Sequence, residues 1–166
     1  MQDFISTLTI WALPVLFAIT LHEAAHGYAA RHFGDRTAEL AGRISLNPLR
    51  HIDPMGTIVV PALILVTSSL AAGSAMLFGW AKPVPVNFGR LRSPKADMLW
   101  VAAAGPLANL FMAIGWALLF RVAMMISESD YAIPLARMAD AGMQINAVLM
   151  ILNLLPLPPS TAGASR

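Results

Sequence analysis

A short run of the sequence, His22-Glu23-Ala24-Ala25-His26, combines two side chains that can bind a metal with one that can accept a proton. Residues four positions apart lie on the same face of an α-helix, so the imidazoles of His22 and His26 can reach a single metal ion. Glu23 lies beside that ion, where its carboxylate can take a proton from a water molecule. The spacing therefore predicts a zinc site with a general base next to it.

The surroundings of this run are apolar. Residues 5–21 contain no ionisable side chain. In residues 24–30, His26 is the only histidine, and no Asp, Glu, Lys or Arg occurs. A charge at the centre of a bilayer costs about 2.5–3.5 kcal/mol even on the mildest insertion scales. Ionisable side chains at that depth are therefore candidates for function.

The composition of the chain is typical of a membrane protein. Its 166 residues are 57% hydrophobic and 12% charged, whereas an average soluble domain is roughly 25% charged. A soluble protein with buried core helices needs more polar surface than this sequence supplies. The net charge of +2 arises from basic residues beside apolar runs, which argues for membrane topology and against nucleic-acid binding. The sequence has no cysteine, which excludes disulfides, thiolate zinc ligands and thiol nucleophiles.

Four apolar blocks divide the chain, and they define one membrane domain over residues 1–159. A hydrocarbon core needs about 20 helical residues, so the first and third blocks are long enough to span it and the fourth is short. We expect an all-α, polytopic bundle of transmembrane helices with short extended cytoplasmic segments. The blocks are residues 4–30, 55–78, 98–126 and 143–157.

The placement of charges bears on the second block. Basic residues lie both before and after it, and the positive-inside rule places both basic segments in the cytoplasm. The second block then enters the membrane and returns as a re-entrant segment, which requires that protein or water cover its non-helical backbone. The alternative is a plain spanning helix whose following segment breaks the rule, and both remain open. The basic residues are Arg31, Arg36, Arg43, Arg50, Lys82, Arg90, Arg92 and Lys95.

Gly105, Pro106 and Asn109 lie near the start of the third block. Glycine permits close approach of two backbones, proline frees a carbonyl, and an asparagine amide in hydrocarbon needs a hydrogen-bond partner. If the first and third blocks run in opposite directions, these residues lie at the depth of the two histidines. The alternative is a helix-packing notch with one interhelical hydrogen bond.

Asn153 lies near the end of the fourth block and is followed by prolines at positions 156, 158 and 159. These prolines cannot continue an ordinary helix, so we expect the chain to unwind here. Asn153 can then bind the freed backbone groups or a peptide. A simple helix end at the membrane surface is the alternative.

Residues 79–87 form an extended segment between the second and third blocks, because Pro83 and Pro85 push their predecessors toward extended geometry. This segment presents an edge to an extended substrate, or it anchors the chain at the membrane surface through Trp80 and Lys82. Both readings remain open. His32 and His51 lie among the arginines of the first basic segment, and we expect them at the surface.

Three sequence patterns occur in order along this apolar chain: His-Glu-x-x-His, Gly-Pro-x-x-Asn and Asn-x-x-Pro-x-Pro-Pro, which begin at His22, Gly105 and Asn153. In this combination the chain resembles the site-2 protease family of intramembrane zinc metalloproteases, specifically the compact bacterial type without a PDZ domain. Residues 42–49, 51–56 and 79–87 also look like stretches of that group, so the resemblance covers nearly the whole chain.

The resemblance implies a function for each pattern. His22 and His26 would bind Zn²⁺, and Glu23 would be the general base that activates water for attack on a peptide bond. The substrate would be a locally unwound transmembrane segment of a membrane-anchored protein, and the enzyme a multi-pass protein of the bacterial inner membrane in contact with lipid. Support of the active site or substrate would fall to Gly105, Pro106, Asn109 and Asn153.

One part of the chain departs from the family pattern. After Pro159 the family continues Leu-Asp-Gly-Gly-Arg, whose aspartate is the third zinc ligand, whereas Thr161 stands at that position here. A catalytic zinc normally holds three protein ligands and one open position. The resemblance therefore implies that the activity of the chain as given is impaired.

A frameshift would account for this tail if the gene uses the GC-rich codons chosen below and continues with Ile-Ala, and chance agreement is the alternative. Leu-Asp-Gly-Gly-Arg-Ile-Ala, written CTC GAC GGC GGG CGC ATC GCG and read one base later, gives Ser-Thr-Ala-Gly-Ala-Ser-Arg, which is the sequence of residues 160–166. We hypothesise that residues 160–166 are non-native. Sequencing the gene through this junction tests the hypothesis, and a gene with no frame encoding Leu-Asp-Gly would contradict it.

A second function class remains possible on the same residues. A non-catalytic membrane protein could use Asn109 and Asn153 to bind transmembrane helices without cleaving them. A metal transporter fits less well, because its polar groups would be distributed along a pathway, whereas here they gather at one depth.

Overall fold

The computed structural model describes residues 2–51, 53–60, 63–64, 67 and 82–155. Every regular element in these residues is a helix, as the sequence predicts. They are α1 (Gln2–His32), α2 (Thr37–Leu40), η1 (Pro48–Arg50), η2 (Pro54–Val59), η3 (Phe88–Arg90), α4 (Pro94–Met125) and α5 (Ala132–Leu154).

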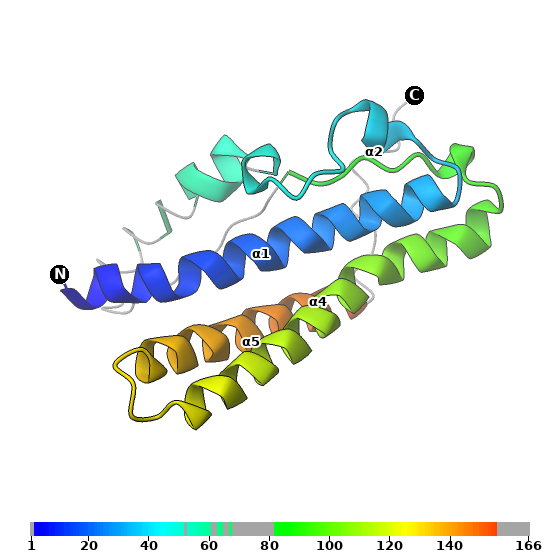
Figure 1. The fold of residues 1–166 in the computed structure, drawn as a ribbon. Coiled ribbons are helices and arrows are strands. Elements are labelled where there is room, and N and C mark those ends of the chain that lie inside the picture. The colour runs from blue at the N-terminus through cyan, green and yellow to red at the C-terminus, as the bar shows by residue number, and fades with distance from the viewer. Residues whose placement is uncertain (1, 52, 61–62, 65–66, 68–81, 156–166) are drawn as a thin grey trace.

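Three long helices form the body of the protein. α4 and α5 are antiparallel neighbours joined by a short loop, and α1 packs against both of them (Figure 1). α2 and the extended segment 82–87 lie on the opposite side of α1 from the α4–α5 hairpin (Figure 1). One face of α1 therefore meets α4 and α5, and another meets the short elements.

α4 and α5 are long and apolar enough to cross a membrane. Only 11% of the most apolar window of α4 and 22% of that of α5 are buried. The core helix of a soluble protein hides its apolar side chains from water, whereas these face outward, as expected where lipid covers them. The question of a re-entrant second block rests on residues 61–62, 65–66 and 68–78, which lie outside the described residues.

The fourth helix is longer than its apolar block. α5 begins at Ala132, not near residue 143, and it contains 23 residues, so the expectation of a short final segment is wrong. Its first turns include Arg137 and Asp140, which interrupt the apolar run without interrupting the helix. Gln144 donates a hydrogen bond from Nε2 to Oδ2 of Asp140 at 2.8 Å, a pair four residues apart that supports the helix on its exposed side.

His51 is buried, so its expected surface position is wrong, whereas His32 is exposed as expected. The His51 Nε2 atom donates to the carbonyl of Ser45 at 2.8 Å, and the backbone carbonyl of His51 accepts from the N–H of Lys82 at 2.9 Å. His51 thus joins the loop that precedes η2 to the start of the extended segment 82–87.

Asp35 links α1, α2 and the extended segment. It is fully buried, its Oδ1 accepts from the backbone N–H and the hydroxyl of Thr37 at 2.9 and 2.5 Å, and its Oδ2 accepts from the N–H of Asn87 at 2.6 Å. Burial by itself raises the pKa of Asp35, but these hydrogen bonds and nearby Arg90 outweigh it and hold the pKa below its ordinary value of 3.8.

We expect Asp35→Asn to lower the free energy of unfolding by about 2 kcal/mol, because an amide cannot accept all three hydrogen bonds. The depressed pKa also predicts a pH effect. The stabilisation is complete above the unfolded-state pKa and is lost as the pH falls through the lower folded-state pKa. Thermal unfolding in detergent across this acidic range measures both effects. Asp130→Asn, in the exposed α4–α5 loop, is the control, and equal acid sensitivity of the two variants would contradict the assignment.

Candidate metal centre

His22 and His26 converge on one point beside α4. Their Nε2 atoms lie 3.1 Å apart, and their rings meet edge to face at an interplanar angle of 83°. His22 is 6% exposed, so water is largely excluded from it. The i, i+4 spacing on α1 therefore brings the two imidazoles together, as the sequence predicts.

The other nitrogen of each ring is hydrogen-bonded to α4. The Nδ1 atom of His26 lies 2.7 Å from the carbonyl oxygen of Val101, and Nδ1 of His22 is bonded to Oδ1 of Asn109. A carbonyl oxygen can only accept, so Nδ1 of His26 is the protonated nitrogen of the neutral ring. Nε2 of His26 then presents a lone pair toward His22.

The amide of Asn109 is itself oriented by α5. Nδ2 of Asn109 donates to Oδ1 of Asn146 at 2.8 Å, and Nδ2 of Asn146 donates to the backbone carbonyl of Gly142 at 2.8 Å. This order leaves Oδ1 of Asn109 to accept from Nδ1 of His22. His22 therefore also presents an Nε2 lone pair.

Two lone pairs facing each other at 3.1 Å repel unless a cation or a proton lies between them. Tetrahedral zinc with bonds of 2.0–2.1 Å to nitrogen places two ligand nitrogens about 3.3 Å apart. The spacing, the tautomers and the anchored Nδ1 atoms of His22 and His26 thus fit a zinc ion. Among the residues that the structure describes, no third His, Cys, Asp or Glu joins this pair as a metal cluster.

Gly105 closes the site from the side of α4. A Cβ atom added to it would fall 2.7 Å from Nε2 of His22 and closer still to Nε2 of His26. Pro106 follows it inside the helix, and both residues are buried. The predicted close approach at Gly105 and the predicted common depth with the histidines are therefore present.

Glu23 faces a different neighbour. Its Oε2 accepts a hydrogen bond from the backbone N–H of Val84 at 2.8 Å. Successive residues of a helix are about 100° apart, so Glu23 points away from α4 and toward the extended segment 82–87. Gly27, one turn later on this side of α1, allows Val84 to pack closely, because a Cβ there would fall 3.3 Å from Cγ1 of Val84.

The segment 82–87 is extended, as Pro83 and Pro85 predict, and residues 79–81 lie outside the described residues. Val84 is buried between the two exposed prolines, and its N–H is the donor that holds Glu23. The candidate base thus lies between the histidine face of α1 and this segment.

Asn153 is not brought to the histidines. It is exposed near the end of α5, and its Nδ2 donates to the carbonyl of Leu149 at 2.8 Å, within its own helix. The prolines from position 156 onward and the tail 160–166, with Thr161, lie outside the described residues.

Asn146 is a site residue that the sequence reasoning missed. It is fully buried on α5 and is the partner of Asn109. A signal was present in the sequence, because an asparagine inside an apolar helix needs a hydrogen-bond partner, as was argued for Asn109. A second signal is the position of Asn146, two turns before Asn153 on the same helix face.

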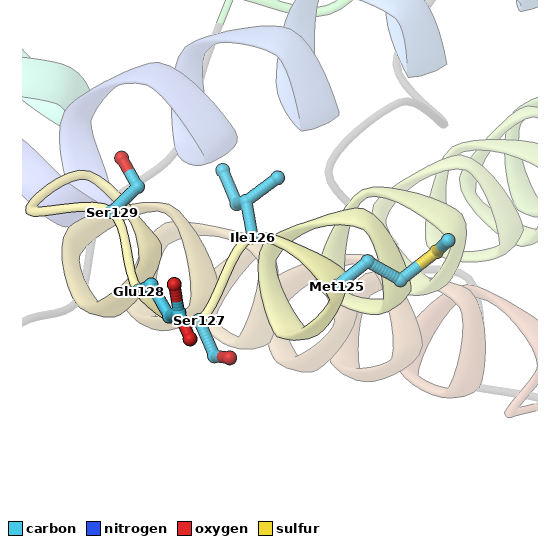
Figure 2. A pocket seen from close by; sticks show the side chains of 5 residues that line it. All are labelled: Met125, Ile126, Ser127, Glu128 and Ser129. Carbon is cyan, nitrogen blue, oxygen red and sulfur yellow. The ribbon is translucent and has the colours of Figure 1, made fainter.

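A pocket in the described residues lies away from the histidines. It is an open hollow of about 500 Å³ at the α4–α5 loop, lined by residues 125–129 (Figure 2). A helix rises about 1.5 Å per residue, so Met125 lies roughly 24 Å along α4 from Asn109. This hollow contains no histidine and is separate from the metal centre.

The chain is similar to two bacterial proteins over 93% of its length. It is 38% identical over 158 residues to "Putative zinc metalloprotease YwhC" of Bacillus subtilis and covers 66% of that protein. It is 31% identical over 156 residues to "Putative zinc metalloprotease Rip2" of Mycolicibacterium smegmatis and covers 53% of it. The chain thus spans between half and two thirds of these relatives' length. No family model and no solved structure matches it. With its His-Glu-x-x-His, Gly-Pro-x-x-Asn and Asn-x-x-Pro patterns, the chain's similarity to these zinc metalloproteases supports its resemblance to the site-2 protease family.

Proposed function

We propose that this chain forms the core of a zinc-dependent protease that cleaves membrane-anchored proteins within the bilayer. The observation that supports this most directly is the pair of Nε2 lone pairs on His22 and His26, 3.1 Å apart, with both Nδ1 atoms anchored to α4. When bound there, zinc would polarise a peptide carbonyl and lower the pKa of water. The two relatives' names, which refer to zinc metalloproteases, agree with this proposal.

Glu23 is the proposed general base. The Val84 N–H holds one oxygen of its carboxylate, which restricts the side chain to one orientation and leaves the other oxygen to accept a proton from water. A base that is held before substrate arrives loses less conformational entropy when the reaction begins. The extended segment 82–87 would therefore contribute to catalysis by fixing the base.

The proposed location of the reaction is the bilayer of the bacterial inner membrane. α4 and α5 expose their apolar side chains, and α1, which holds the histidines, packs against both. α1 and α4 run in opposite directions (Figure 1), and the hydrogen bond between His22 and Asn109 joins residues 22–26 to residues 105–109, which supports the proposal that both lie at one depth. The substrate would be a transmembrane segment that unwinds locally at this depth, since a helical peptide bond is already hydrogen-bonded.

We propose that the third zinc ligand is the aspartate of a Leu-Asp-Gly sequence after Pro159, and that the tail 160–166 replaces it in this chain. We expect a version with Leu-Asp-Gly-Gly-Arg restored to retain about one zinc per chain after dialysis, and the chain as given to retain less. Elemental analysis of both purified proteins measures this. His22→Ala should lose zinc in both backgrounds, and equal zinc in the two parent proteins would mean that the third ligand lies elsewhere.

A second function is supported by the lack of a third His, Cys, Asp or Glu near the histidines in the described part of the chain. In that case the chain would bind transmembrane helices without cleaving them. Stable co-purification of a membrane-anchored partner, without stoichiometric zinc and without turnover, would favour this function over proteolysis.

A further inference from the structure

We propose that Asn146 is a positioning residue, which acts through Asn109 to hold His22 in the tautomer that can bind metal. The inference rests on the proposed function in one respect, namely that His22 is a metal ligand. Asn146 does not touch His22, since Asn109 lies between them.

Asn146 and Asn109 form a hydrogen-bond relay from the Gly142 carbonyl to His22. The Gly142 carbonyl sets the direction of this relay. The Gly142 carbonyl can only accept, so the Asn146 amide must turn its Nδ2 toward it and its Oδ1 toward Asn109. Asn109 must then donate to Asn146 and accept from His22. One backbone carbonyl on α5 thus orients the two amides so that Asn109 accepts a hydrogen bond from Nδ1 of His22.

Because Asn109 and Asn146 are buried, the relay between them is needed to orient the Asn109 amide. Asn109 and Asn146 are both fully buried, so water does not replace a lost partner. Gly142 brings α5 close enough to α4 for the contact, because a Cβ there would fall 2.6 Å from Cε2 of Trp116. Without Asn146, the Asn109 amide is free to rotate and present its Nδ2 to His22 instead.

His26 favours the opposite tautomer of His22, in which Nε2 carries the proton. If His22 were protonated on Nε2, it could donate a hydrogen bond to Nε2 of His26 across 3.1 Å. That arrangement relieves the lone-pair repulsion of the metal-free site, but it blocks a zinc-binding atom. The relay through Asn146 therefore opposes a favourable local alternative.

The two histidines are fixed by different means. Nδ1 of His26 bonds directly to the backbone carbonyl of Val101, which no side-chain substitution removes. Nδ1 of His22 depends on two amide side chains in series. A change at Asn146 should therefore alter His22 and leave His26 unchanged, which provides an internal control.

The test compares Asn146→Leu with Asn146→Asp in the zinc-free chain. Leucine removes both hydrogen-bonding groups and has a similar branched shape. Aspartate, which is ionised at the alkaline pH of the measurement, gives up the hydrogen bond to Gly142 but keeps a carboxylate oxygen that accepts from Nδ2 of Asn109. Nitrogen-15 NMR of the histidine-labelled chain in detergent at alkaline pH, where imidazoles are neutral, reports the protonated nitrogen of each ring.

We expect His22 to be protonated on Nδ1 in the parent chain and in Asn146→Asp, and to shift toward Nε2 protonation in Asn146→Leu. His26 should stay protonated on Nδ1 in all three. Titration with Zn²⁺ alone should show about 10- to 100-fold weaker binding for Asn146→Leu. If Asn146→Leu does not fold, Asn146→Ala replaces it.

His22 remaining protonated on Nδ1 in Asn146→Leu would overturn the inference. So would a shift of both histidines together, because that would indicate general loss of packing. Failure of the proposed function gives a different result: the tautomer of His22 would still depend on Asn146, but the parent chain and the version with the restored Leu-Asp-Gly sequence would not bind Zn²⁺.

Discussion

Replacing Glu23 with glutamine is expected to abolish peptide cleavage while zinc stays bound. Glutamine has the same shape, and its amide oxygen can still accept the hydrogen bond of the Val84 N–H, so the side chain should keep its place. The amide cannot take up a proton, however, and loss of a general base typically lowers the rate about 10²- to 10⁴-fold. His22 and His26 are not altered, so the metal should remain.

This prediction is best measured in the version with the restored Leu-Asp-Gly sequence. Cleavage of a membrane-anchored reporter gives the rate, and elemental analysis of the same sample gives the zinc content. Glu128→Gln, in the exposed α4–α5 loop, is a matched control that should leave both unchanged. Cleavage that survives Glu23→Gln would refute the proposed role of Glu23, and loss of zinc would instead make Glu23 part of the metal site.

The sequence predicted the centre of this site because its determinants are local. The i, i+4 spacing of His22 and His26 specifies a shared helix face, and the lack of side-chain volume at Gly105 indicates a close approach. The placement of Gly105 and Asn109 opposite the histidines followed from the opposite directions of two apolar blocks. These expectations needed no knowledge of the loops.

The parts that the sequence did not predict depend on tertiary contacts. The burial of His51 and the role of Val84 arise from the folding of the 82–87 segment back onto α1, which no local pattern reports. The apolar block at residues 143–157 marks only part of α5, because polar residues such as Arg137 and Asp140 on one side of a helix are compatible with it. The partnership of Asn109 with Asn146 required the register of α4 against α5.

Replacing Gly105 with alanine is expected to prevent zinc binding. The new methyl group would lie within 2.7 Å of Nε2 of His22 and nearer still to Nε2 of His26, which is where the metal would be held. Both imidazoles are fixed at Nδ1, so they cannot rotate aside without breaking a buried hydrogen bond. We expect the affinity for Zn²⁺ to fall at least about 100-fold, at the upper end of the effect of a lost supporting contact.

The same substitution elsewhere on α4 separates this steric effect from a general effect of alanine. A Cβ added to Gly115 would meet nothing within 4 Å, so Gly115→Ala should retain zinc. It should also raise helix stability by about 0.5–1 kcal/mol, because alanine loses less backbone entropy than glycine. Zinc content and thermal unfolding of both variants in detergent measure the contrast. If Gly105→Ala binds zinc as tightly as Gly115→Ala does, the space in front of Gly105 is not where the metal lies, and the two histidines would have to bind it from another side of α1.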